Sequence, residues 1–145
     1  MDLTKGFIIK TPSKFVPWRI RDLELEDLFD GFPLKKVKRG YYTIKCEPLS
    51  GLHCIVGFHL HEYNVLSEFE FFKEMKDFLE LEHSYAAFQN HFEAEFGPPT
   101  KTTKGAEGFP SHEWIVPGAR IYHLVRERWG PEEMMRIRRR TEHQA

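Results

Sequence analysis

Apolar and polar residues alternate along two neighbouring runs of the chain, GYYTIKCE and LHCIVGFHL, which the turn-like segment PLSG separates. Side chains of a β-strand point alternately to its two faces, so the pattern predicts two strands paired as a hairpin. Matching the apolar faces sets the expected register, with Tyr42 opposite Phe58, Ile44 opposite Val56, and Cys46 opposite Cys54. A disulfide between the two cysteines would be strained, and we expect two buried, reduced thiols.

Two segments have the apolar spacing of helices. Residues 22–33 (DLELEDLFDGFP) predict a helix with Asp22 as N-cap, and residues 84–96 predict a second one that begins at Ser84 and ends before Gly97-Pro98-Pro99. The apolar stripes are Leu25, Leu28 and Phe29 in the first segment, and Tyr85, Phe88, Phe92 and Phe96 in the second. Each helix is therefore expected to bury one face.

The remaining apolar runs predict strands. Six are expected, at about 36–47, 52–61, 64–73, 112–116, 120–128 and 132–139. Residues 1–14 are expected to form a loosely held arm with a short strand at Phe7–Ile9. Residues 14–20 predict an edge strand, because Pro17 cannot donate a ladder hydrogen bond. The segment 97–111, rich in Gly, Pro, Lys and Thr, predicts a loop.

The order of these elements is helix and three strands, then helix and three strands. We interpret residues 1–145 as one α+β domain in which 22–73 and 84–139 are two copies of an αβββ unit. Two such units would form a curved antiparallel sheet with helices on one face. The alternative is a chance likeness between the two halves of an ordinary α+β domain, which has the same fold class.

The second face of such a sheet is expected to remain open to water. The strand pattern places the following residues there: Tyr41, Thr43, Lys45, His53, His59, His61, Glu68, Glu70, Trp114, Met134, Arg136 and Arg138. Aromatic residues and arginines embedded in a polar face are typical of protein-binding surfaces. A solvated sheet face without any partner has the same composition, and both interpretations stay open.

Composition and charge narrow the class of protein. Hydrophobic residues make up 41% of the chain and the formal net charge is −1, which favours a folded domain without a global basic field. The start of the chain lacks the apolar core of a signal peptide, and no run approaches the length of a membrane span. We therefore expect a soluble, cytoplasmic protein.

Signatures of catalysis are missing from the sequence. It contains no phosphate-binding glycine loop, no nucleophile elbow, no zinc-protease motif and no CxxC pair, so we expect no enzymatic activity and no cofactor. His59 and His61 are the best metal candidates, because alternate strand residues point the same way; His53, Glu68 or Glu70 could supply a third ligand. The simpler interpretation is two solvated histidines. Glu68 and Glu70 could in principle act as an acid/base pair, although exposed alternating glutamates are commoner.

Charge is segregated along the chain. Residues 62–96 carry nine Asp or Glu against two Lys, whereas residues 120–140 carry seven Arg against three Glu. An acidic side formed by Glu68, Glu70, Glu74, Asp77 and Glu80 could steer the protein toward a basic partner. The terminal run 136–140 could instead contact phosphate, but the near-neutral pI of about 6.7 disfavours nucleic acid as the partner. Either run could also be an ordinary solvated surface.

The segment Ser84–Ile137 resembles immunity proteins encoded beside secreted bacterial toxins of contact-dependent and type VI systems. The likeness lies in SYAAFQNHFEAEFGPP, HEW and IYHLVRERWGPEEMMRI, that is, in aromatic spacing, the FGPP break and the RWGPEE turn. The tandem αβββ plan is also similar in outline to the β-lactamase inhibitory protein, which is an analogy of fold alone.

The resemblance implies a non-catalytic inhibitor that binds one cognate toxin, and it assigns no binding residue. From the strand pattern and the charges, the contact residues that we predict are Tyr41, His59, His61, Glu68, Glu70, Glu74, Asp77, Glu80, Arg136 and Arg138. A small metal-binding domain or enzyme centred on His59 and His61, and a nucleic-acid-binding accessory protein, are the alternatives. The open sheet face could equally form a homodimer.

Overall fold

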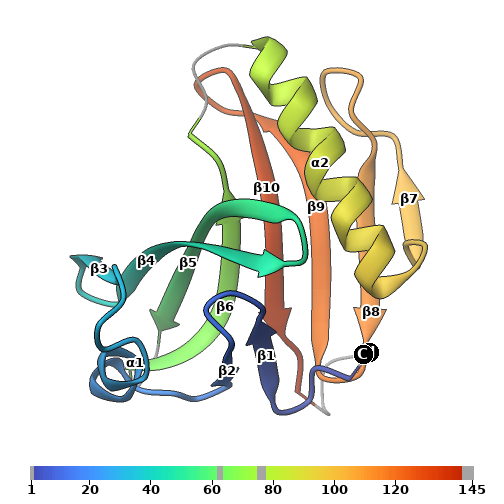
Figure 1. Cartoon of the computed structure of the whole chain (residues 1–145). Coiled ribbons are helices and arrows are strands. Elements are labelled where there is room, and N and C mark those ends of the chain that lie inside the picture. Colours follow the sequence, from blue (N-terminus) through green and yellow to red (C-terminus); the bar gives the residue numbers. More distant parts are fainter. Residues whose placement is uncertain (1, 62–63, 75–77, 142–145) are drawn as a thin grey trace.

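The computed structural model describes residues 2–61, 64–74 and 78–141 and confirms the α+β fold class (Figure 1). Its described helices are α1 (Asp22–Leu28) and α2 (Phe78–Phe96). A two-stranded sheet pairs β1 (Gly6–Ile9) with β2 (Lys14–Pro17). The main antiparallel sheet consists of β3 (Lys35–Lys38), β4 (Tyr41–Leu49), β5 (Leu52–His61), β6 (Val65–Phe72), β7 (Lys101–Thr103), β8 (Ser111–Val116), β9 (Ala119–Glu127) and β10 (Pro131–Arg139).

The main sheet has an internal symmetry in its strand order, β3-β4-β5-β6-β10-β9-β8-β7. Each helix is followed by four strands, and the last strands of the two sets, β6 and β10, pair with each other. The sequence predicted three strands after each helix, and one additional short strand in each set, β3 or β7, makes four. The predicted strand 36–47 is a hairpin, because the chain turns at Gly40, and β7 lies inside the predicted loop 97–111.

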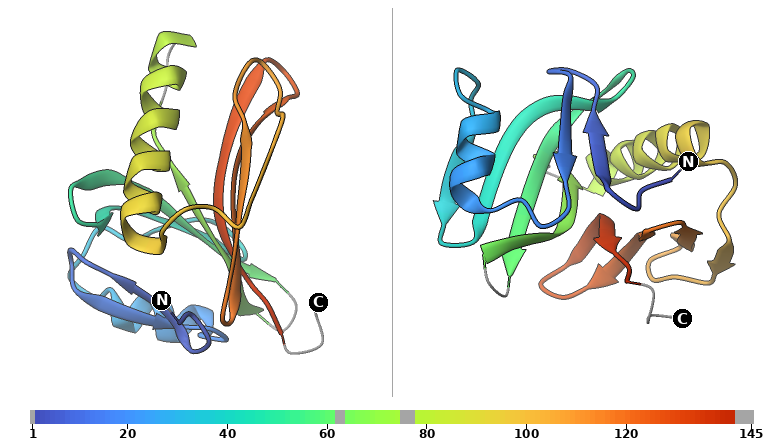
Figure 2. Two further views of the ribbon diagram at one scale, coloured as in Figure 1. Left: turned by 90° about the vertical axis from the view of Figure 1, so that its right-hand side faces the viewer. Right: turned by 90° about the horizontal axis from the view of Figure 1, so that it is seen from below.

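Both helices and the β1–β2 hairpin cover the same side of the main sheet, which is strongly twisted (Figures 1 and 2). From α2, Phe88 and Phe92 are fully buried, and from α1, Phe29 packs on Phe58 of β5 at 5.6 Å between ring centroids. Phe7 of β1 contacts Phe69 and Phe71 of β6. The predicted arrangement of helices on one face is therefore confirmed, and none of the described helices or strands covers the other face of the main sheet.

The β4–β5 hairpin has the register that the alternation predicts. Tyr42 pairs with Phe58, Ile44 with Val56 and Cys46 with Cys54. Tyr42, Ile44, Val56 and Phe58 are all at most 1% exposed. Both cysteines are free thiols, Cys54 buried and Cys46 half-buried. Alternation predicted this register correctly because the hairpin is local, and a shift by one residue would move Tyr42, Ile44, Val56 and Phe58 to the open face.

The N-terminal segment is not a loose arm, and that expectation was wrong. Leu3 is 2% exposed, and the Trp18 indole donates a hydrogen bond of 2.7 Å to its carbonyl oxygen. The Leu3 amide donates to the carbonyl of Pro117 in the β8–β9 turn. Gly118 makes this approach feasible, because its φ is +84° and a Cβ there would lie 2.3 Å from Cα of Thr4.

Three smaller expectations also need correction. The N-cap of α1 is Arg21 and not Asp22, and the Arg21 amide donates a hydrogen bond to the Glu24 carboxylate. Helix α2 begins at Phe78, so Ser84 lies inside it rather than capping it. Trp114 is 1% exposed and faces α2, where its indole donates to the carbonyl of Gly97, instead of lying on the open face. Helices of the described chain are all too short or too polar to cross a membrane.

Candidate functional site

The uncovered face of the main sheet is the surface that this fold leaves available for function. Strand register places the following residues on it: Tyr41, Thr43 and Lys45 of β4, Gly57 and His59 of β5, Glu68 and Glu70 of β6, Arg136 and Arg138 of β10, Arg120 and Tyr122 of β9, Glu113 and Ile115 of β8, and Lys101 of β7. We call this set the open face. Its centre is the β6–β10 junction, where the two sets of four strands meet.

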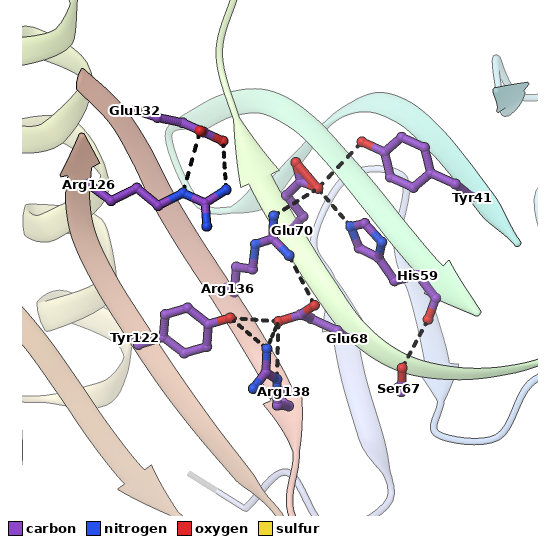
Figure 3. A network of polar contacts seen from close by, with 10 residues as sticks. All are labelled: Tyr41, His59, Ser67, Glu68, Glu70, Tyr122, Arg126, Glu132, Arg136 and Arg138. Atoms are coloured by element: carbon purple, nitrogen blue, oxygen red, sulfur yellow. Dashed lines mark hydrogen bonds and ion pairs between the residues drawn. The ribbon is translucent and has the colours of Figure 1, made fainter. Parts of the chain in front are cut away.

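Glu68 is the most enclosed polar residue of the open face. Its side chain is 6% exposed and accepts hydrogen bonds from three other side chains (Figure 3). The Arg136 guanidinium donates to Oε2 at 3.1 Å, whereas Arg138 and the Tyr122 hydroxyl donate to Oε1 at 3.1 and 2.8 Å. Arg138 also donates to the Tyr122 hydroxyl at 3.0 Å. Each of these side chains therefore fixes the others.

Glu70 connects the same cluster to the first set of strands (Figure 3). Its Oε2 accepts a hydrogen bond of 2.7 Å from His59 Nε2 and one of 3.4 Å from the Tyr41 hydroxyl, and it lies 3.7 Å from Arg136 Nη2. Tyr41 also stacks on His59, with ring centroids 4.6 Å apart. We call Tyr41, His59, Glu68, Glu70, Tyr122, Arg136 and Arg138 the junction network.

Gly57 allows Tyr41 to reach this network. A Cβ at position 57 would lie 2.9 Å from the Tyr41 ring carbon Cε1 and 3.0 Å from its hydroxyl oxygen. Carbon atoms in contact normally lie about 3.5–4.0 Å apart. A residue larger than glycine would therefore displace the tyrosine that lies flat across this strand.

Burial and neighbouring charges shift the pKa values of four residues of the network, Tyr41, Glu70, Tyr122 and Arg136. Burial alone would raise the pKa of Glu70, but the His59 hydrogen bond and the charge of Arg136 outweigh it and lower that pKa. Burial alone would lower the pKa of Arg136, and the charges of Glu68 and Glu70 raise it instead. Burial and the neighbouring carboxylates raise the pKa of Tyr41 and of Tyr122 to about 12. At neutral pH Glu70 and Arg136 are therefore charged, and the phenols of Tyr41 and Tyr122 are neutral.

The structure brings together six of the ten predicted contact residues, namely Tyr41, His59, Glu68, Glu70, Arg136 and Arg138. His61 adjoins them, with its ring stacked 5.9 Å from that of His59. Glu74 and Glu80 do not join the network; they line a separate hollow of about 200 Å³ beside the start of α2. Asp77 lies outside the described residues.

The charge segregation noticed in the sequence is in part internal pairing, through Glu68 and Glu70. Acidic β6 lies beside basic β10, with Arg136 opposite Glu70 and Arg138 opposite Glu68 in the ladder. The acidic charge of Glu68 and Glu70 is therefore neutralised within the fold. The two glutamates therefore contribute less to the long-range electrostatic steering of a partner than the sequence suggested.

The described residues form no set of metal ligands around His59 and His61. His59 Nε2 is engaged with Glu70, and the His59 and His61 rings are stacked with an interplanar angle of 20°. Parallel rings do not direct their nitrogen lone pairs toward one ion. Within the described ranges, no three His, Cys, Asp or Glu side chains are grouped so as to hold a metal.

Catalytic arrangements on the open face are equally poor. Arg136 pairs with both carboxylates of the Glu68–Glu70 pair and Arg138 pairs with Glu68, so both carboxylates are engaged within the fold instead of being available as an acid/base pair. Burial raises the pKa of Cys54 well above its usual value and that of Cys46 to about 12, so neither thiol is a ready nucleophile.

A second polar cluster lies on the covered side, beneath α2. His123 is fully buried and bonds Gln89 Oε1 at 2.8 Å and Glu133 Oε2 at 2.5 Å, and Ser84 donates to the same carboxylate at 2.6 Å. The serine contacts the carboxylate and not the imidazole, so it is not paired with a base as a nucleophile would be. The cluster links α2 to the sheet through buried hydrogen bonds, and Nε2 of Gln89 is buried without a partner.

Sequence reasoning missed two features of this face. Tyr122 and Arg120 belong to the predicted strand 120–128, but their face could be assigned only after β9 was paired with β10. Trp129, at the end of the β9–β10 hairpin, is 92% exposed, with the Arg128 guanidinium 5.8 Å from its ring centroid. The RWGP turn was visible in the sequence, although only the structure shows that its tryptophan is uncovered.

Comparison of the chain with models of known protein families, with curated proteins and with solved structures finds no match.

Proposed function

We propose that this protein is an immunity-type inhibitor, a non-catalytic cytoplasmic protein that binds one cognate bacterial toxin in equal stoichiometry through its open face. The supporting observation is the junction network, in which aromatic, arginine and glutamate side chains of an uncovered sheet hold one another in place. Association ordinarily costs about 0.5–1.5 kcal/mol for each long side chain that it immobilises. The network residues are already fixed, so this cost is small.

The edges of the main sheet favour binding through its face. Both edge strands, β3 and β7, are short, exposed along their whole length and carry lysines. Short, lysine-bearing edges resist pairing with a further strand. A partner is therefore directed to the broad surface, where Tyr and Arg, the residue types that dominate binding energy, are concentrated.

The size of the molecule is adequate for such a complex. Its accessible surface is 8648 Å². A stable complex typically buries about 800 Å² on each partner, roughly a tenth of that surface. The exposed Trp129 and Arg128, at the end of a hairpin of the same sheet, provide a further pair of side chains suited to a partner's pocket.

The test is capture of the tagged protein from its native cells, identification of bound proteins by mass spectrometry, and titration calorimetry with the purified partner. We expect one partner, bound in equal stoichiometry, whose toxicity co-expression of this protein suppresses. A protein that is captured alone, or whose partner is harmless, would contradict the proposal.

A matched pair of variants tests the face. Ile115 lies on the open face and Leu23 on α1; both are exposed apolar residues, at 39% and 70%. Ile115→Trp should weaken partner binding by about tenfold or more through steric obstruction, whereas Leu23→Trp should change it by less than about twofold. Equal affinity of both variants would exclude the open face as the binding surface.

A further inference from the structure

A pocket of about 340 Å³ lies on the open face beside the junction network, between β7 and β10. Three cationic side chains line it, Lys101, Arg120 and Arg138, together with Tyr122 and the single carboxylate of Glu113. The pocket thus has an excess of positive charge, although the whole chain has a net charge of −1.

The two arginines are directly opposite each other in the β9–β10 ladder. Like charges in that position destabilise a sheet unless an anion compensates them. Their guanidinium carbons lie 5.5 and 5.4 Å from the centroid of the same ring, that of Tyr122. Both guanidinium groups thus lie near the Tyr122 ring, and all three side chains line the pocket.

The internal counter-ions leave part of both guanidinium groups unused. Glu113 accepts a hydrogen bond from Arg120 Nη2 alone, at 3.0 Å, and Glu68 accepts from Nε and Nη2 of Arg138 while also holding Arg136. The Arg120 and Arg138 side chains remain 45% and 51% exposed. Lys101 takes part in none of the ion pairs found among the described residues.

We propose that this pocket binds a carboxylate, supplied by an Asp or Glu side chain of the partner protein. Planar guanidinium groups with free N–H donors match a carboxylate and form the stronger, charge-assisted class of hydrogen bond. A single carboxylate matches the pocket, whereas a chain with a net charge of −1 has no global basic field that would attract nucleic acid. The inference rests on the proposed function, because it names the chemistry of the partner at the same face.

The experiment uses hexaglutamate as the probe and the isolated full-length protein, with binding followed by NMR of the ¹⁵N-labelled chain at constant ionic strength. Arg120→Gln is the pocket variant and Arg126→Gln its matched control. Arg126 lies on the same strand, pairs with Glu132 as Arg120 pairs with Glu113, and is 41% exposed. Both substitutions remove one charge from a surface ion pair, so thermal melting should show similar stability.

We expect Arg120→Gln to weaken hexaglutamate binding by about tenfold or more and Arg126→Gln by less than about twofold. Signals of residues 101, 120 and 138 should shift on titration. An equal loss in both variants would show a general charge effect, and no binding by the wild type would show no site; either result overturns the proposal. Tighter binding of single-stranded DNA than of hexaglutamate would also overturn it, in favour of phosphate.

The outcome is separable from that of the proposed function. If hexaglutamate binding depends on Arg120 but no toxin is captured, the pocket stands and the immunity role falls. If a toxin binds wild type and Arg120→Gln equally well, the immunity role stands and this carboxylate assignment falls.

Discussion

Glu68 is only 5% exposed, and its carboxylate is tolerated there because each of its oxygens is hydrogen-bonded. Taking an ion out of water costs several kcal/mol unless partners replace the solvent. Here Arg136, Arg138 and Tyr122 replace it. The same arrangement that satisfies Glu68 fixes the arginines on the open face, so stability and a preformed surface have one cause.

The lowered pKa of Glu70 predicts a pH-dependent contribution to stability. A carboxyl group whose pKa is lower in the folded state stabilises the fold above its unfolded value, here 4.5, and loses that contribution as pH falls through the folded value. Glu70→Gln should lower the free energy of unfolding by about 1–3 kcal/mol at neutral pH. Urea titrations from neutral to acid pH should show this difference shrinking below the unfolded pKa.

Glu82→Gln is the control for that experiment, because Glu82 is an exposed residue of α2. It should differ little from the wild type over the whole pH range. A Glu70→Gln difference that stays constant down to acid pH would contradict the assignment of Glu70 as a charged hydrogen-bond acceptor.

Gly57 and Tyr41 should be energetically coupled. Gly57→Ala places a Cβ at 2.9 Å from the Tyr41 ring and should cost about 1–3 kcal/mol of unfolding free energy. In a Tyr41→Ala background the same substitution should cost much less, since the obstructing ring is gone. A double-mutant cycle by chemical denaturation measures the coupling. Additive effects of the two substitutions would show that the ring does not lie over residue 57.

At the scale of elements, the edge strands decide how the sheet ends. All four residues of β3 are exposed, and three of them are lysines, Lys35, Lys36 and Lys38. An unprotected edge exposes N–H and C=O groups to other chains, and charged side chains discourage their pairing. The lysines of β3 therefore disfavour the addition of a further strand at this edge.

Replacing the β3 lysines tests this role. Lys35→Thr combined with Lys38→Thr should promote association through β3, seen as a shift to larger species in size-exclusion chromatography with light scattering. Lys5→Thr with Lys104→Thr is the control, because both lysines are exposed outside the strands and the change in charge is the same. Equal behaviour of the two double variants would show that net charge, and not edge protection, governs association.

The length of α2 is a case in which local signals misled prediction at this scale. Ser84 has the residue type of an N-cap and precedes the aromatic stripe, so the helix was expected to begin there. In the structure its hydroxyl donates to Glu133 of β10, a partner 49 positions away. A serine inside a helix can thus be explained by a tertiary contact that local sequence does not reveal.

The whole molecule is two sets of a helix and four strands that join through β6 and β10. One continuous core runs from Leu3 in the N-terminal segment to Ile137 in the last strand. The junction network lies on the opposite side of the same two strands (Figure 3). The site is therefore a property of the junction, and neither set of strands could form it alone.

The sequence alone determined most of the elements and the β4–β5 pairing of this protein, but not the β3–β4 turn, β7 or the start of α2. Alternation of apolar residues predicted the β4–β5 register and the one-sided placement of the helices, because burial allows a single solution over a short hairpin. It also placed Tyr41, His59, Glu68, Glu70, Arg136 and Arg138 on one face. Only the tertiary structure decided which of them meet, since Arg136 and Glu68 are 68 positions apart and local periodicity carries no information about strand order. The burial of Glu68, the covering of Gly57 by Tyr41 and the opposition of Arg120 and Arg138 all follow from that long-range pairing.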